Sequence, residues 1–185
     1  MDDKTLIVDF LAGDQSSFTH LVENNLPIIY RYAFRLTRDE GDAQDITQET
    51  FVKVWRNISK FDLNKNFRTW ILAIAHNTAL DLLRKKKDLV FSEFDTNEGG
   101  NTITDTLADP SPLPSEIFAH AENKKLLDHA MSKLPLNVRE VLVLHYHEGL
   151  TFAEIGDILE KPLNTVKSQH KRALDSLREI LEKSM

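Results

Sequence analysis

The chain has 185 residues, of which 41% are hydrophobic and 28% charged, with a net charge of -6 and no cysteine. This is the composition of a soluble globular protein with one domain or two small ones. The lack of cysteine excludes disulfides and thiolate metal sites, and a reducing cytoplasm is the expected compartment. No apolar run is long enough to span a membrane, and the acidic start Met1-Asp2-Asp3 argues against a secretion signal.

Acidic and basic residues are segregated along the chain. The segment 88–122 holds eight acidic residues and neither lysine nor arginine. The segments 61–87 and 161–185 are each rich in lysine and arginine. The negative total therefore does not exclude nucleic-acid binding, because two separate basic segments remain that can contact phosphates.

The segment 4–38 carries apolar residues at helical spacing, interrupted at Gly13-Asp14 and at Pro27, and predicts packing helices. A sharper pattern follows over 42–58. Its predicted inner face contains Phe51, Val54, Trp55 and Ile58. Its predicted outward face carries Asp42, Asp45, Gln48, Glu49 and Arg56.

The carboxylates of that outward face raise the question of acid–base or metal chemistry. No histidine lies close enough in sequence to complete a ligand set, so such chemistry is disfavoured. A solvated face and a docking surface for a basic or polar partner remain as the two alternatives.

A polar break at 61–66 precedes the next predicted helix, 67–87, and Asn66 is its expected cap. Apolar residues surround most of this helix, which predicts burial on two sides or a covering partner. Its basic end, Arg84 to Lys87, suits both the helix dipole and a phosphate. A solvated basic terminus is the alternative interpretation.

The segment 88–115 is predicted to be a flexible acidic linker, because it combines Gly99-Gly100 and three prolines with acidic residues. It divides an N-terminal module, 1–87, from a C-terminal module, 116–185. A helix from Ser115 onward is expected to lead to Leu134-Pro135.

The segment 134–177 predicts a helix-turn-helix. Thr151 and Glu154 have the spacing of a capping box at the start of a short helix, and the pattern breaks at 160–163. The following helix has an apolar stripe of Leu163, Val166, Ala173, Leu174 and Leu177. Its opposite face is polar and basic, with groups that can reach base edges and phosphates in a major groove. These groups are Asn164, Lys167, Ser168, Gln169, Lys171 and Arg172.

No convergent catalytic set is visible in the sequence. His145 and His147 are two residues apart, so on a helix they point to different sides, and a metal-binding HExxH spacing is absent. There is no phosphate-binding glycine loop and no nucleophile elbow. We expect neither an enzyme nor a metal or other cofactor.

Several segments together resemble the extracytoplasmic-function sigma factors of bacterial RNA polymerase. They keep the order of that family and cover nearly the whole chain outside the linker. They are DAQDITQETF at 42–51, FRTWI at 67–71, IAHN at 74–77, Leu134-Pro135, EGLTFAEI at 148–155 and NTVKS at 164–168.

The resemblance implies an all-α protein of two small helical domains, sigma-two over 1–87 and sigma-four over 116–185, joined by the linker. It places the polymerase-binding surface at Asp45, Gln48 and Glu49. It places contacts to the −10 promoter element, including a flipped base, at Phe61, Asn64, Lys65, Asn66, Asn77, Arg84 and Lys85. It places contacts to the −35 element at Thr165, Lys167, Ser168, Gln169, Lys171 and Arg172.

The resemblance also implies the partners. They are core RNA polymerase, through the clamp helices of its largest subunit and its flap, promoter DNA, and an anti-sigma factor. The linker would lie in polymerase channels that otherwise carry nucleic acid. This chain departs from the family pattern at Ala73 and Gln169, where basic residues are usual, and at His170, where an apolar residue is usual.

Two rival interpretations remain at this stage. A transcription regulator could use the same helix-turn-helix without polymerase, but it would carry a sensing or dimerising domain in place of the acidic and aromatic N-terminal helices. A small all-helical enzyme would need the catalytic set that the sequence lacks.

Overall fold

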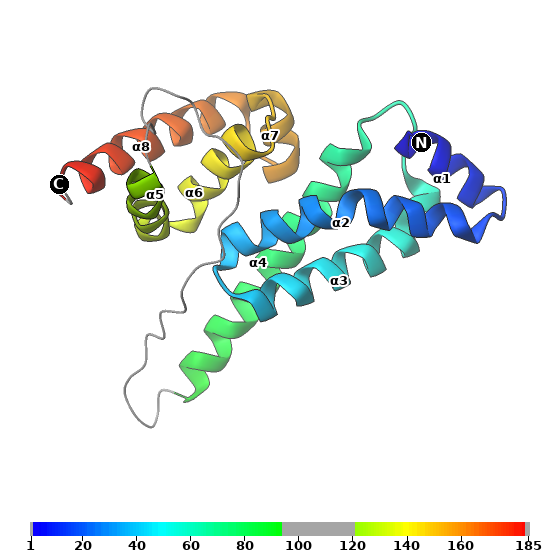
Figure 1. The fold of residues 1–185 in the computed structure, drawn as a ribbon, viewed down its shortest axis with the longest axis horizontal. Coiled ribbons are helices and arrows are strands. Elements are labelled where there is room, and N and C mark those ends of the chain that lie inside the picture. The colour runs from blue at the N-terminus through cyan, green and yellow to red at the C-terminus, as the bar shows by residue number, and fades with distance from the viewer. Residues whose placement is uncertain (1, 94–120, 184–185) are drawn as a thin grey trace.

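The structure is a computed structural model that describes residues 2–93 and 121–183. Every regular element in these two ranges is a helix. Figure 1 shows two groups of helices that pack against each other, one from each range. The expected all-α fold with two helical domains is therefore confirmed. No helix in the described ranges is long and apolar enough to cross a membrane.

The first domain contains α1 (Asp3–Leu11), α2 (Gln15–Thr37), α3 (Glu40–Asn57) and α4 (Phe67–Glu93). Side-chain caps define two of the starts, because Asp14 accepts a hydrogen bond from the Ser16 amide and Asp39 accepts one from the Asp42 amide. Pro27 does not end α2 but lies inside it, on an exposed position. The carbonyl that loses its amide partner there can be hydrated, which lowers the cost of proline within a helix.

The core of the first domain lies between α2, α3 and α4, with α1 packed against α2. Fully buried aliphatic and aromatic side chains fill it at helical spacing. They include Leu6, Ile7, Leu21, Ile29, Leu36, Ala43, Ile46, Val54, Ile71 and Ala75.

Two side chains of α3 lie on the opposite side from that predicted. Trp55 was expected inside but is 55% exposed. At about 100° per residue it lies roughly 40° past Phe51, which is the last buried position on that edge of the helix. Asp42 was expected outside but is 7% exposed, because it lies at the opposite edge and its carboxylate pairs with Lys86 of α4.

Helix α4 continues to Glu93, beyond the expected end at Lys87 and into the first residues of the predicted linker. The rest of that linker, and the start of the helix expected from Ser115, lie outside the described residues. The first helix of the second domain, α5, is described from Ala121 to Lys133.

The second domain continues with α6 (Leu136–Leu142), a π-helical turn η2 (Val143–His147), α7 (Phe152–Leu159) and α8 (Leu163–Glu182). The predicted capping box at the start of α7 is confirmed. The Thr151 amide donates to Glu154 Oε2 at 2.9 Å, and the Glu154 amide donates to Thr151 Oγ1 at 3.3 Å. Because both amides are satisfied, α7 begins at a fixed residue.

A tight turn joins α7 to α8 and sets the angle between them. Glu160 adopts the left-handed conformation with φ of 52°. A Cβ atom on Gly156 would lie 2.8 Å from the Lys161 carbonyl oxygen, so the turn needs glycine at that position. On α8, Val166, Ala173 and Leu177 are buried as predicted, whereas Leu163, expected in the same stripe, is 44% exposed because it stands in the first turn of the helix.

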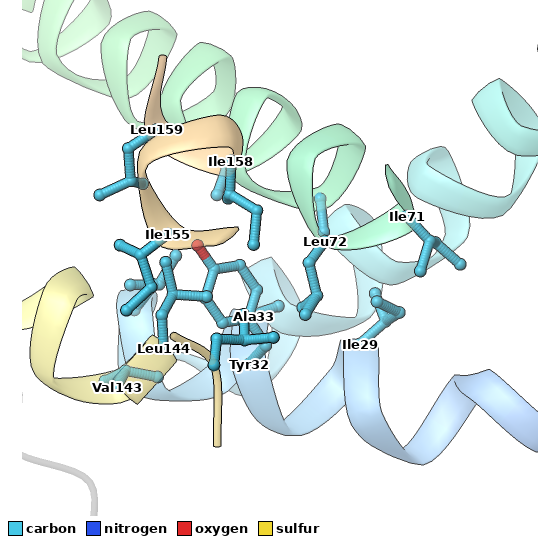
Figure 2. Packing of buried hydrophobic residues seen from close by; sticks show 14 of the residues in the cluster. Ile29, Tyr32, Ala33, Ile71, Leu72, Val143, Leu144, Ile155, Ile158 and Leu159 are labelled. Carbon is cyan, nitrogen blue, oxygen red and sulfur yellow. The ribbon is translucent and has the colours of Figure 1, made fainter. Parts of the chain in front are cut away.

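The apolar cores of the two domains are continuous. Figure 2 shows Tyr32 of α2 and Leu72 of α4 beside Ile155 and Ile158 of α7. The helix-turn-helix is therefore packed onto the first domain through α7, while α8 lies on the far side of α7.

Candidate nucleic-acid interface

The second helix of the helix-turn-helix, α8, presents its polar face to solvent. Val166 and Ala173 fix one side of the helix in the core, so the side chains between them point away. The exposed residues on this face are Asn164, Thr165, Lys167, Ser168, Lys171 and Arg172. This confirms the predicted outward basic face of α8. A helix exposed in this way can enter a major groove.

Gln169 differs from its neighbours on α8. It is half-buried, and its side-chain oxygen is enclosed without a hydrogen-bond partner among the described residues. Of the residues predicted to contact the −35 element, Gln169 is thus the one least free to reach DNA.

A cluster of aromatic and imidazole rings holds α8 against the preceding helices. His170 Nε2 lies 3.2 Å from the hydroxyl oxygen of Tyr146, and the ring centroids of His145 and His170 are 5.2 Å apart. His145 Nδ1 donates to the Leu150 carbonyl, and its ring stacks on Phe152. Burial, and secondarily the neighbouring His145, lower the pKa of His170. Both histidines thus have a structural place, and the π-helical turn η2 carries His145 to the side of α8.

In the first domain, residues 62–66 form an exposed loop fixed by its own side chains. Asp62 Oδ1 accepts hydrogen bonds from both the backbone and the side chain of Asn64, each at 3.0 Å. Asn66 Oδ1 accepts from the Arg68 amide at 2.9 Å, which confirms it as the cap of α4. Asn64, Lys65 and Asn66 are exposed. They form a rigid polar rim.

Phe61 lies beneath this rim. Its side chain is 8% exposed, and its ring centroid is 5.5 Å from that of Phe67 and 5.0 Å from that of Trp70. Phe61 therefore supports the loop from below, and the polar side chains above it are the ones that can contact a ligand.

Three predicted −10 residues follow one line along the first domain. Asn77 is eleven positions after Asn66, so the two lie about 20° apart around α4 and roughly 16 Å apart along it. Arg84 lies two helical turns further on nearly the same line, whereas Lys85 lies about 100° around the helix from Arg84, toward α3. Asn77, Arg84 and Lys85 are all exposed. The result is an exposed polar track that becomes basic.

The outward face of α3 carries Asp45, Gln48 and Glu49, all of them exposed. They line a groove of about 470 Å³ together with Lys53 of the same helix and Thr78 and Lys85 of α4. Lys53 Nζ donates to Thr78 Oγ1 at 3.0 Å and so ties α3 to α4 beneath these acids. The acidic face is thus mounted on a rigid pair of helices.

An apolar groove of about 730 Å³ between α2 and α3 was not predicted from the sequence. The exposed Trp55 and Leu26 lie on it, with Phe18, Val22 and Phe51 deeper in. The groove was not predicted because the helical pattern assigned Trp55 to the core. The sequence signal for it is the position of this aromatic residue at the edge of the buried stripe of α3.

Residues 21–88 match the protein family described as Sigma-70 region 2, and residues 130–179 match Sigma-70, region 4. The ECF RNA polymerase sigma factor SigW of Bacillus subtilis (strain 168) is 35% identical over 180 residues, which are 96% of each protein. SigE of Mycolicibacterium smegmatis, also named an ECF RNA polymerase sigma factor, is 32% identical over 93% of this chain and 65% of its own length.

Two solved structures have the same fold. The sigma factor RpoE of Bartonella quintana, in complex with the anti-sigma factor NepR, has a TM-score of 0.72 at 22% identity, over 89% of this chain and 96% of its own. CnrH, in complex with the cytosolic domain of CnrY, has a TM-score of 0.70 at 24% identity, over 99% of both chains.

An exposed basic recognition helix in a helix-turn-helix, joined to a second domain with its own polar track, defines a two-domain DNA-binding protein. The matches to Sigma-70 regions 2 and 4, and the 35% identity over almost the full length, identify the family within this class. The chain belongs to the family of ECF RNA polymerase sigma factors. This confirms the resemblance found in the sequence. It is a family of non-enzymatic transcription initiation factors, which answers both rival interpretations.

Proposed function

We propose that this protein binds core RNA polymerase in the cytoplasm, directs it to promoters and opens them, using three separate surfaces of the two domains. The observation that carries the proposal is their arrangement. The acidic face of α3, the polar track of α4 and the basic face of α8 are all exposed while their opposite faces are buried. Each surface is therefore available to a different partner.

The polymerase-binding surface is assigned to Asp45, Gln48 and Glu49. Their position on α3 supports this, because α3 is packed between α2 and α4 and cannot reorient without breaking the core. Two carboxylates on a rigid helix suit a partner surface with basic or hydrogen-bond donating groups, such as the clamp helices of the largest polymerase subunit. The polymerase flap is a further part of the proposed partner.

The −10 element is assigned to the rim at Asn64, Lys65 and Asn66 and to the track formed by Asn77, Arg84 and Lys85. Short amides can hydrogen-bond base edges or sugars of an unpaired strand, and the basic end of the track suits its phosphates. In this assignment Phe61 supports the rim from below, because its buried ring packs on Phe67.

The −35 element is assigned to α8, through Thr165, Lys167, Ser168, Lys171 and Arg172, with Gln169 at the edge of the contact. Lysine and arginine can bond guanine edges or phosphates in the major groove. The half-buried position of Gln169 makes its contribution the smallest of the set.

An anti-sigma factor is a further partner in this proposal. The two solved structures of the same fold supply the support, since RpoE was determined with an anti-sigma factor and CnrH with the cytosolic domain of CnrY. The exposed acidic face of α3 and the apolar groove beside it are the surfaces on which such a partner would compete with polymerase.

Reconstitution with core polymerase tests the proposal directly. The purified chain is added to core enzyme and a library of promoter fragments, and promoter-dependent transcripts are sequenced. We expect transcripts with defined start sites that share upstream elements and that disappear without the chain. Stable binding to DNA with no association with core polymerase would instead favour a regulator that acts alone.

A further inference from the structure

The exposed face of α8 offers few groups that distinguish one base pair from another. Lys167, Lys171 and Arg172 are exposed cations, and such groups bond either guanine edges or phosphates. The Ser168 hydroxyl donates to the Thr165 carbonyl at 2.9 Å, and a hydroxyl does not discriminate between bases. None of these side chains is suited to select an adenine–thymine pair.

Asn164 differs from them because it carries a free carboxamide. It is exposed, and its side chain makes no hydrogen bond with any described residue. The other carboxamide of α8 belongs to Gln169, and its oxygen is enclosed. A carboxamide presents one donor and one acceptor, and adenine presents the complementary pair, N7 and the N6 amino group, in the major groove. Asn164 is therefore the side chain of α8 best suited to read adenine.

The position of Asn164 on α8 directs this carboxamide outward. Ala173 is fully buried and follows nine positions later, so the two side chains point in opposite directions. Lys171 follows seven positions later and lies about 20° from the line of Asn164. Asn164 thus stands at the centre of the exposed face, in the first turn of the helix. In a helix-turn-helix, the first residues of the second helix are those that contact base edges.

An apolar side chain lies beside Asn164 at the same end of α8. Leu163 is 44% exposed, although the rest of the exposed face is polar or charged. Pro162 precedes it, and no side-chain hydrogen bond caps this first turn. The methyl group of thymine is the apolar feature of the major groove, and apolar side chains contact it. Leu163 is therefore suited to cover a thymine methyl, a contact that removes apolar surface from water.

We propose that the first turn of α8 reads adenine–thymine pairs within the −35 element. The amide group of Asn164 donates to adenine N7, and its oxygen accepts from the N6 amino group. Leu163 covers the methyl group of a thymine in an adjoining pair. The cations further along α8 supply affinity through phosphates and guanines. This base preference rests on the proposed function, in which α8 contacts the −35 element.

A randomised promoter library tests the preference and locates the two base pairs. Holoenzyme assembled from core polymerase and the full chain transcribes fragments with a randomised upstream element, each identified by a barcode in its transcribed part. We expect a preference for adenine at one position and for thymine at a neighbouring one. Asn164→Ala should lower the adenine preference about fivefold or more at that position alone. Asn24→Ala, which removes an exposed asparagine of α2, is the matched control and should change no preference.

Modified bases then test each contact by binding of holoenzyme to a promoter duplex. At the adenine so located, 7-deazaadenine removes the N7 acceptor. It should weaken binding by the unmodified chain about fivefold or more and leave binding by Asn164→Ala unaffected. Uracil in place of the thymine removes only the methyl group, which should cost the unmodified chain about three- to fourfold and Leu163→Ala nothing. Leu11→Ala, at a similarly exposed leucine of α1, should keep the full response to uracil.

The modified duplexes test these contacts with the unmodified chain, so the result does not depend on the folding of a variant. Circular dichroism and thermal melting establish that the variants are folded, as expected for exposed positions. Transcription with an unchanged adenine preference in Asn164→Ala would overturn the assignment of Asn164. An equal effect of uracil on Leu163→Ala and on the unmodified chain would overturn that of Leu163. If the unmodified chain gave no promoter-dependent transcripts at all, the proposed function would fail, and the base preference with it.

Discussion

The side chains on the exposed face of α8 differ in how far they can reach. Lys167, Lys171 and Arg172 are exposed, whereas Gln169 is partly enclosed and His170 is turned toward Tyr146. The resemblance in the sequence led us to expect an apolar residue at the position of His170. Here an imidazole fills it and packs on Phe152 at 4.9 Å between ring centroids, so the recognition helix is held by polar and stacking contacts together.

Replacement of Lys167 or Arg172 by alanine should weaken holoenzyme binding to promoter fragments. We expect a loss of about 1–3 kcal/mol if the side chain bonds a base edge, and a smaller salt dependence if it bonds a phosphate. Fluorescence binding at several salt concentrations distinguishes the two. Arg178→Ala, at an exposed position nearer the end of the same helix, is the control. Unchanged affinity and salt slope in both variants would remove α8 from the −35 assignment.

The turn between α7 and α8 requires a glycine at position 156. Gly156→Ala would place a methyl group 2.8 Å from the Lys161 carbonyl oxygen, which belongs to the backbone and cannot move away alone. We expect the free energy of unfolding to fall by about 1–3 kcal/mol despite the better helix propensity of alanine. Denaturant unfolding measures this. Equal or greater stability would mean that the turn relaxes easily.

At the scale of whole helices, α3 and α4 have opposite character. The outward face of α3 is acidic, whereas the exposed line of α4 is amidic and basic, and its other side is covered by the second domain. Under the proposed function, these neighbouring helices serve different steps of initiation. Substitutions on their exposed faces should leave the fold intact, because such positions contribute little to stability.

Charge reversal at Asp45 and Glu49 should abolish holoenzyme assembly, because it repels or unpairs the polymerase surface. Asn77→Ala should instead assemble normally and still bind duplex promoter through α8, yet open it poorly. Core-binding assays, duplex binding and permanganate footprinting of unpaired thymines separate these steps. If Asn77→Ala lost core binding while the reversals kept it, the two helices would have been assigned the wrong way round.

At the scale of the whole molecule, the interface between the domains contains a buried histidine. His76 lies 3.3 Å from the Tyr32 hydroxyl and near Glu140, with Lys161 and Glu160 also acting on it electrostatically. Burial lowers the pKa of His76 below its usual 6.5, and Glu140 only partly opposes this. With the two domains packed together, which we call the closed arrangement, His76 therefore stays in its neutral form near neutral pH.

Acidification should open the molecule. Because the pKa of His76 is lowered in the closed form, its stabilising effect is present above about pH 6.5 and is lost as pH falls through the lowered value. Each unit by which the pKa is lowered corresponds to about a tenfold change in the open-to-closed ratio. The chain has no cysteine, so dyes can be attached through Asn24→Cys in the first domain and Glu179→Cys in the second, both at exposed positions. Energy transfer between these dyes from pH 7.5 to 5.5 measures the ratio of open to closed molecules. His76→Gln should flatten this profile, and an equally steep profile in that variant would assign the dependence to another group.

The sequence by itself determined the all-α fold with two helical domains, the starts of α4 and α7, and the outward basic face of α8. These depend on local signals, namely the period of apolar residues, the capping box at Thr151 and Glu154, and the cap at Asn66. All of these are properties of residues a few positions apart. The family resemblance had the same origin, since its motifs are continuous short segments.

Only the tertiary structure decided what happens at the edges of helices and between domains. Whether Trp55 is inside or outside, and whether Asp42 is solvated or paired with Lys86, depends on where α2 and α4 meet α3. Glu148 is the clearest case. Its sequence neighbours give no sign of burial, and it is buried because Arg35 and Arg68, 113 and 80 positions away, reach it across the domain interface. Burial of a charge follows from such distant pairing, which no local pattern encodes.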